Sequence, residues 1–337
     1  MLKKIIKSSE FITFSIIVLL SLVIGFINPA FFSLATLFDV LRASIVLSIM
    51  AFGLLLVIIA GGIDISFVAF SALAAYGTHM FLLSRGYQGG IFLYYLIACT
   101  IGLLAGLLSG WIITRFNLPI FDVSLAMMTM WYGFIRFFIG STKNFKLPEG
   151  AVGYYSKFLV TVKDPFVGEA GLHESVLFVL IIGVLIHCLL KYTTLGRGIY
   201  AMGGNREVAI RSGFNVKQIL MVAFGILGVL SAFAGVTHSF LSRHFEPTLF
   251  MTQNLDVIAA VILGGASVTG GRGSVPGTFM GVILIQLINR AMILTGISVE
   301  WQQLMIGLVL TLFISIPAIR DLLNKRASRS VELPEEI

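Results

Sequence analysis

The stretch Lys191–Lys217, KYTTLGRGIYAMGGNREVAIRSGFNVK, interrupts an otherwise apolar chain with a polar, basic segment. Inside it, Asn205 is a good N-cap and Gly213 a good residue to follow a helix. Between them an acid in the first turn, Glu207, precedes a base near the end, Arg211, by four positions, which favours a helical side-chain pair. A helix of about seven residues is too short to be stable alone, since isolated helices need roughly 12–15. We therefore expect this helix to dock on another surface.

The composition of the whole chain indicates a polytopic membrane protein. Hydrophobic residues make up 58% of it and charged residues 12%, whereas soluble domains carry about 25% charge. The net charge of +7 does not indicate nucleic acid binding, because Lys and Arg of membrane proteins gather on the cytoplasmic side. The two cysteines, Cys99 and Cys188, lie in apolar runs and predict no disulfide. The apolar run Phe11–Ile27 is expected to be a retained span and not a cleaved leader, since no small-residue cleavage site follows it.

Ten stretches approach the 20 mostly apolar residues that a membrane-spanning helix needs. They are Phe11–Ile27, Ala43–Ile63, Ile65–Ser84, Ile91–Thr114, Leu118–Ile139, Ser175–Leu190, Gln218–Ser242, Leu255–Val268, Val275–Ile293 and Trp301–Pro317. The eighth is short, and the fifth carries Asp122 and Arg136, so nine to eleven spans stay open. The sequence thus predicts an all-α membrane protein of about ten spans, with residues 1–337 forming one transmembrane domain.

The distribution of charge predicts the orientation of these spans. The N-terminal residues and the C-terminal tail are basic, and loop 191–217 has five bases against one acid. Loop 140–174 has four lysines against four acids and is neutral. The positive-inside rule then places both termini and loop 191–217 in the cytoplasm, and loop 140–174 outside it. Five spans before the outer loop, one between the loops and four after agree with this orientation.

Two glycine-rich breaks separate apolar runs. In Gly61–Ser66, GGIDIS, a helix can end and restart with Asp64 as N-cap, and Asp64 and Ser66 either cap helices or line a polar path. In Leu263–Gly277, LGGASVTGGRGSVPG, irregular backbone at membrane depth requires cover by protein or water. The second break lacks the Lys-Ser/Thr ending of a phosphate-binding loop, and the chain has no Walker A motif. We therefore expect no bound cofactor and an ATPase, if transport uses one, on another polypeptide.

Other chemistry is not indicated. The five histidines have no metal-ligand spacing, and no nucleophile lies in a recognisable pattern with a base, so neither a metal site nor an enzyme is expected. Glycines at every fourth position of the fourth span, Gly102, Gly106 and Gly110, indicate close helix packing. Polar residues at the ends of apolar runs are candidates for lining a translocation path, although each can equally be a cap or a packing contact: Asp64, Ser66, Gln253, Asn254, Ser267 and Thr269.

Three sequence blocks carry a resemblance to a known family. They are Gly61–Ser66; Gly196–Arg197 continuing through Gly203–Gly213, GGNREVAIRSG; and Asp256–Ser267, DVIAAVILGGAS, continuing to Gly273. In their order and spacing, over nearly the whole chain, they resemble the membrane permease subunits of bacterial ABC importers for simple sugars, the ribose-type permeases. Glu207-Val208-Ala209, three residues and Gly213 also resemble the EAA-xxx-Gly loop of importer permeases.

The resemblance implies an ABC importer permease fold in the bacterial inner membrane, embedded in lipid. It implies a pore of two permease subunits, identical or paralogous, a cytoplasmic ATPase that uses ATP and Mg²⁺, and an extracytoplasmic sugar-binding protein. It implies that loop 191–217 is the cytoplasmic coupling loop and that helix Arg206–Ser212 fits a groove of the ATPase. The coupling residues would be Asn205, Arg206, Glu207, Ala209, Arg211 and Gly213.

The resemblance leaves the substrate open. The family usually continues the first block with Val-Gly-Ser, where this chain has Phe67-Val68-Ala69. This variation weakens transfer of any fine sugar preference, and autoinducer-2-type permeases share such variation. A branched-chain amino acid permease is the nearest alternative. A second alternative is an ion-coupled secondary transporter, for which Asp64 and Asp122 are the candidate ion-coupling acids. A third alternative is a scaffold protein of the membrane.

Overall fold

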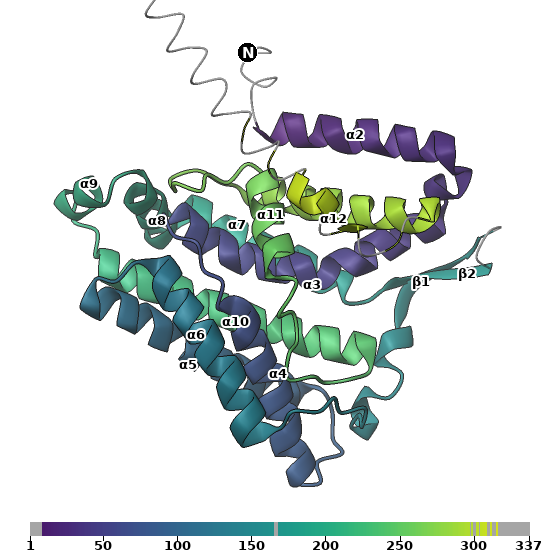
Figure 1. Cartoon of the computed structure of the whole chain (residues 1–337), viewed down its shortest axis with the longest axis horizontal. Helices are drawn as coiled ribbons and strands as arrows, with labels where there is room; N and C mark the ends of the chain where they lie inside the picture. Colours follow the sequence, from purple (N-terminus) through teal and green to yellow (C-terminus); the bar gives the residue numbers. More distant parts are fainter. Residues whose placement is uncertain are drawn as a thin grey trace, which may run out of the picture.

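The computed structural model describes residues 9–164, 168–296, 298, 301–302, 304–308, 311 and 315. The described chain is mostly helical (Figure 1). The basic residues before position 9, the basic C-terminal tail and eight of the 17 residues of the tenth predicted span, Trp301–Pro317, lie outside the described residues.

The main helices follow the apolar runs of the sequence. They are α2 (Ser9–Ile27), α3 (Leu34–Ile59), α4 (Phe67–Ser84), α5 (Phe92–Phe116), α6 (Ile120–Phe134), α7 (Val176–Tyr192), α8 (Thr194–Gly204), α9 (Arg206–Arg211), α10 (Val216–Ser242), α11 (Asn254–Leu263) and α12 (Val275–Thr295). A π-helical turn, Ile135–Ile139, extends α6, and short 3₁₀ turns lie at Pro29–Phe32, Glu149–Ala151 and Tyr154–Ser156.

Six of the described helices are long and apolar enough to cross a membrane: α2, α3, α4, α5, α10 and α12. α7 and α8 together pass the same test but meet at an angle of 72°, which makes a seventh span if the bent pair counts as one. The 15-residue α6 and the 10-residue α11 are shorter. Each of the first nine predicted spans overlaps one of these helices, so the prediction of a polytopic helical membrane protein is confirmed.

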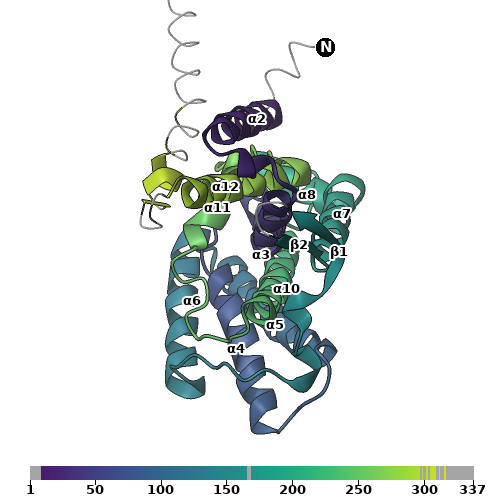
Figure 2. The ribbon, with the colours of Figure 1, turned by 90° about the vertical axis from the view of Figure 1, so that its right-hand side faces the viewer.

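α10 lies at the centre of the packing, against α3, α4 and α5. Figure 2 shows α2 and α12 along one edge, α3 and α10 in the middle, and α4 and α6 reaching the opposite edge. The predicted close packing through α5 is confirmed, because a Cβ added to Gly102 or Gly106 would overlap backbone oxygens of α10. Gly228 of α10 faces Gly102, and a Cβ added to Gly228 would overlap the Gly102 carbonyl oxygen.

Three helix boundaries differ from the prediction by more than two residues, when the π-helical turn is counted with α6. The second span begins earlier, at Leu34, because the side chain of Ser33 accepts a hydrogen bond from the Thr36 amide and caps α3. It ends at Ile59 and not at Ile63. α11 ends at Leu263, five residues before the predicted end, since Gly265 takes a left-handed φ of +92°.

Loop 140–174 contains a β-hairpin that the all-α prediction missed. Strand β1 (Phe158–Asp164) pairs antiparallel with β2 (Gly168–His173), in a register that sets Thr161 opposite Gly171. The hairpin projects to the right in Figure 1. Strand β1 has the sequence FLVTVKD, a short run of mostly strand-favouring residues followed by two charged residues. Counting the charges of the loop does not detect such a run.

His173 joins this hairpin to the start of α7. Its buried imidazole donates through Nε2 to the Tyr154 carbonyl at 2.8 Å and accepts through Nδ1 from the Ser175 amide at 3.1 Å. The bond from the Ser175 amide requires the neutral ring, since a protonated ring has no acceptor. Burial is the main cause that lowers the pKa of His173 from its ordinary value of 6.5.

We therefore expect the stability of the folded chain to fall on acidification through His173. Its pKa is lower in the folded than in the unfolded state, so the contribution is present above the unfolded value of about 6.5 and is lost as the pH falls below it. The measurement is thermal unfolding in detergent between about pH 7.5 and about pH 5. The variant His173→Gln, which cannot be protonated, should show a smaller loss of melting temperature over this range; equal losses would contradict the assignment.

Candidate functional site

Helix α9 forms as its sequence predicts. The Asn205 side chain accepts from the amides of Glu207 at 2.9 Å and Val208 at 3.1 Å, and so caps the helix. At the other end Gly213 has a φ of +86°, and the amide of the next residue, Phe214, donates to the Ala209 carbonyl at 3.1 Å. The helix spans Arg206–Arg211, one residue shorter than expected.

The predicted coupling residues lie on different faces of α9. Ala209 is completely buried against the rest of the chain, whereas Arg206, Glu207 and Arg211 are exposed. The two large apolar side chains of the helix are also exposed, Val208 at 56% and Ile210 at 55%. Apolar side chains on an exposed helix among charged neighbours favour a protein contact. The sequence prediction missed both, although two aliphatic residues in a polar loop were a usable signal.

The predicted side-chain pair of α9 is not formed. Among the described residues no ion pair joins Glu207 to Arg211. Arg206 instead donates through Nη2 to the Asn117 side-chain oxygen at 3.4 Å. Asn117 ends α5 in a left-handed conformation with a φ of 51°. The exposed charges of α9 therefore contribute little within this chain, as is usual for surface charges.

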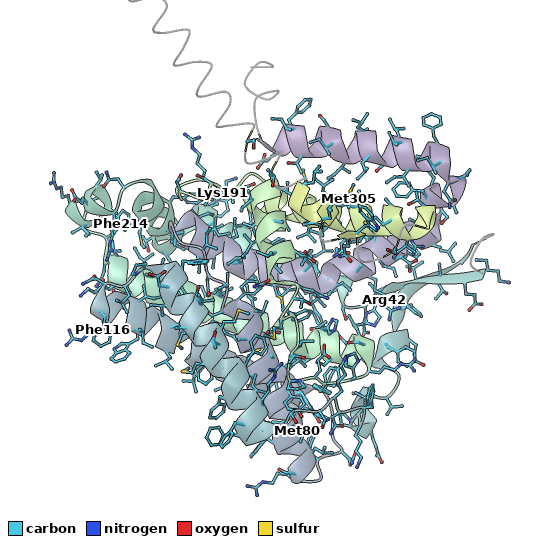
Figure 3. The ribbon with its side chains drawn as sticks, viewed as in Figure 1. Arg42, Met80, Phe116, Lys191, Phe214 and Met305 are labelled. Atoms are coloured by element: carbon cyan, nitrogen blue, oxygen red, sulfur yellow. The ribbon has the colours of Figure 1, made fainter. Side chains whose placement is uncertain are left out.

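The two ends of the molecule differ. Figure 3 labels Phe116, Lys191 and Phe214 at the end that carries α8 and α9, whereas Arg42 lies toward the hairpin. Arg42 donates through Nη2 to the carbonyl of Tyr155, in loop 140–174, at 3.2 Å. The two loops to which charge counting assigns opposite sides of the membrane thus lie at opposite ends of the structure.

Asp64 has a different local role from the one predicted. It is completely buried, and its Oδ1 accepts from the Ser66 amide at 2.5 Å and the Ser66 hydroxyl at 2.6 Å. The N-cap of α4 is Ser66 and not Asp64, because the carboxylate bonds two residues ahead and closes a turn instead. Among the described residues Oδ2 of Asp64 has no hydrogen-bond partner, so this turn buries an acceptor that is open to a further donor.

Ser267 and Thr269 lie in the loop between α11 and α12. Their hydroxyls contact each other at 2.8 Å, and the Ser267 amide donates to the Arg272 carbonyl at 3.0 Å. This loop lies against the end of α8 and the end of α3, as the backbone hydrogen bond from Gly271 to Ile59 shows. Both side chains are therefore at the α9 end of the molecule.

A polar cavity of about 440 Å³ lies at the other end, between α3, α10, α11 and α12. Its volume is in the range of small-molecule sites, roughly 300–1,000 Å³. Nine of its sixteen lining residues are polar: Asp39, Arg42, His238, Ser242, Gln253, Asp256, Gln286, Asn289 and Gln302. Only Gln253 of these was a candidate from the sequence.

Several of these polar groups have fixed positions. Asp39 pairs with Arg290 of α12 at 2.9 Å. His238 packs edge-on against Phe250, with ring centroids 4.8 Å apart. The side-chain oxygen Oδ1 of Asn289 is buried, and no described residue forms a hydrogen bond with it. A cavity that combines carboxylates, amides and an aromatic ring can hydrogen-bond a polar solute and also cover an apolar face of it.

The structure does not bring the six predicted path residues together. Gln253 lines the cavity, and Asn254 follows it at the start of α11 without lining it. Asp64 and Ser66 lie in the turn after α3, and Ser267 and Thr269 in the loop after α11. The cavity residues on α3, α10 and α12 were missed because they lie within apolar helices, where a single polar residue is not distinctive in sequence.

Comparison with known proteins identifies the family. The family model described as "Branched-chain amino acid transport system / permease component" matches residues 36–314. The ribose import permease protein RbsC of Haemophilus influenzae is 32% identical over 299 residues, which cover 88% of this chain and 90% of that protein. RbsC of Escherichia coli K12 is 30% identical over 307 residues, covering 90% and 92%.

A third relative is the galactose/methyl galactoside import permease protein MglC of Escherichia coli K12. It is 30% identical over 317 residues, with 90% of this chain and 92% of MglC covered. No solved structure gives a significant match. A match over most of the length, together with the apolar helices, indicates a multi-pass inner-membrane protein, and the chain belongs to the family of branched-chain amino acid transport system permease components.

Proposed function

We propose that this chain is the permease subunit of an ABC importer that moves a ribose-like pentose, a hexose or a related sugar-like molecule inward across the bacterial plasma membrane. The observation that carries the proposal is the match, over about nine-tenths of both chains, to permeases named for ribose and galactose import. The polar cavity supports it, because a sugar's hydroxyls need closely spaced donors and acceptors.

The cavity is the outer part of the translocation path in this proposal. Gln253, Asp256 and Asn289 supply amide and carboxylate groups for sugar hydroxyls, and Phe250 supplies an apolar surface. The turn containing Asp64 and Ser66 and the loop containing Ser267 and Thr269 lie at the inner end.

The topology is part of the same proposal. Ten spans, cytoplasmic termini, a cytoplasmic loop 191–217 and an extracytoplasmic loop 140–174 agree with the charge distribution. The opposite placement of these loops in the structure supports it. Residues 1–337 then form one transmembrane domain.

The partners follow from this role. A second permease subunit, identical or paralogous, completes the pore, and an extracytoplasmic binding protein delivers the sugar. A cytoplasmic ATPase binds ATP and Mg²⁺, so this chain itself binds neither cofactor nor metal and is not an enzyme. The exposed face of α9, with Val208 and Ile210 between Arg206 and Arg211, is the contact with the ATPase. Lipid covers the outer helix faces, and no nucleic acid takes part.

The test is uptake into proteoliposomes that hold the permease with its cognate ATPase and binding protein. We expect labelled D-ribose or D-galactose to accumulate only when ATP and the binding protein are present, and to do so without an ion gradient. Accumulation of labelled L-leucine instead would favour the amino acid alternative. Uptake driven by a proton or sodium gradient without ATP would replace the proposal with a secondary transporter.

A further inference from the structure

Two helices run from the polar cavity toward the α9 end of the molecule. α3 lines the cavity with residues between Asp39 and Met50 and ends at Ile59, about 14 Å further on. α11 begins beside the cavity at Gln253 and Asp256, and its ten residues extend about 15 Å. The two helices pack against each other. A contact that fixes the far ends of α3 and α11 therefore also fixes the position of two walls of the cavity.

Those far ends meet the chain that leads into α9, at four glycines that we call the glycine junction: Gly61, Gly203, Gly270 and Gly271. Gly61 follows α3, Gly203 is near the end of α8, and Gly270 and Gly271 follow α11. Each of the three sequence blocks that resemble the sugar permeases contributes to this one place. The sequence alone gave no sign that they meet.

The junction is a contact of backbone with backbone. A Cβ on Gly203 would overlap the Ile59 carbonyl oxygen, and it would lie 2.5 Å from the Gly271 nitrogen. A Cβ on Gly270 would lie 2.7 Å from the Cα of Gly61. The Gly271 amide donates to the same Ile59 carbonyl at 2.8 Å. Contacts of this kind leave no flexible side chain between the three segments.

Two further links connect the junction to α9. The hydroxyl of Tyr200, on α8, donates to the Gly273 carbonyl at 2.7 Å. Asn205 is the single residue between α8 and α9; its amide donates to the Ala201 carbonyl, and its side chain caps α9. α8 and α9 are thus joined without a flexible linker, and a displacement of α9 reaches the ends of α3 and α11 through this junction.

From this geometry we infer that the glycine junction transmits movement of α9 to the cavity, and that Gly203 and Tyr200 are positioning residues for this transmission. The inference rests on the proposed role of α9 as the contact with the ATPase. α3 and α11 move as rods, fixed at the junction and carrying cavity walls at their other ends. Neither residue touches the ATPase or the solute in this mechanism.

The experiment reads the cavity directly and needs no knowledge of the sugar. A reporter permease carries Gln253→Cys in the cavity, with Cys99 and Cys188 replaced by alanine, and is assembled with its ATPase in nanodiscs. The rate of labelling by a water-soluble maleimide is measured without nucleotide and with ATP plus vanadate. In the reporter we expect this rate to change at least about fivefold, the low end of usual coupling factors.

Gly203→Ala and Tyr200→Phe are then added separately to the reporter. Gly203→Ala adds the methyl group for which there is no space, and Tyr200→Phe removes only the hydroxyl that bonds Gly273. Gly204→Ala is the matched control, because it is the next residue of the same helix and a Cβ there has no described atom within 4 Å. We expect the first two variants to lose the ATP-dependent change and the control to keep it, with ATPase binding and ATP hydrolysis retained in all three.

The outcomes separate the two proposals. An unchanged response in Tyr200→Phe together with Gly203→Ala would overturn the role of the junction. Loss of the response in Gly204→Ala to the same degree would overturn it too, since general disturbance of α8 would then explain the effect. A failure of the proposed function would appear earlier, as a reporter permease that binds no ATPase or shows no response to ATP.

Discussion

Permease carrying Val208→Asp and Ile210→Asp should no longer retain the ATPase during purification. Both side chains are more than half exposed on a short helix, beside charged residues. Burying a Val or Ile side chain contributes about 1.5–3 kcal/mol, and an aspartate in the same groove adds the cost of removing a charge from water. We expect ATPase binding to weaken by at least about 100-fold, or about 2.7 kcal/mol.

Binding of the ATPase to permease in nanodiscs, measured by interferometry, checks this expectation. Gln218→Glu is the matched control, since it adds a negative charge at an exposed position near α9, in the first turn of α10. Removing the exposed charges with Arg206→Ala or Glu207→Ala should cost less than the aspartates, because exposed charge pairs contribute roughly 0–1 kcal/mol. If the double aspartate variant bound the ATPase as tightly as Gln218→Glu does, the outward face of α9 would not be the contact.

Asp256→Asn should reduce the ratio of the maximal rate of sugar uptake to the KM for the sugar by about 10- to 100-fold. The side chain lines the cavity at the start of α11, where a carboxylate can accept from two neighbouring hydroxyls of a sugar. Hydrogen bonds to a charged group contribute about 1.5–3 kcal/mol, which corresponds to roughly that factor. Asparagine keeps the volume and removes the charge, so the change reports on recognition more than on packing.

Uptake of labelled D-ribose and D-galactose in proteoliposomes measures the effect, together with ATP hydrolysis stimulated by the binding protein. Asn254→Ala is the control, because Asn254 is two positions away on the same helix and does not line the cavity. It should keep nearly full uptake. Equal losses in the two variants would show that this turn of α11 matters for structure and not for the solute.

The helices and their capping were predictable from the sequence because their causes are local. Runs of apolar residues gave nine of the spans that the structure shows as helices, and Asn205 and Gly213 gave the ends of α9. The errors have local causes as well. The carboxylate of Asp64 accepts a hydrogen bond from the Ser66 amide, and Ser66 is the N-cap of α4. The hairpin at Phe158–His173 has too short a strand pattern to be recognised in a long loop.

The candidate site was only partly predictable, because a polar residue at the end of an apolar run does not reveal which space it faces. Gln253 was a candidate because it is a polar residue at the end of an apolar run. Asp39, His238 and Asn289 were not candidates, since they lie within or near apolar helices. The predicted coupling residues of α9 included its charged residues and Ala209, but not Val208 or Ile210. In the structure Val208 and Ile210 are exposed and Ala209 is buried.

By itself, the sequence determined that this chain is a helical membrane protein with one short capped helix in a basic loop. Those properties depend on hydropathy and on interactions between residues a few positions apart. Only the tertiary structure decided which residues form the cavity, which face of α9 is free, and that Gly61, Gly203 and Gly270 meet. These depend on contacts between residues far apart in the sequence, such as Asp39 with Arg290 and Gly61 with Gly270. Such contacts are set by helix packing and leave no periodic pattern in the sequence.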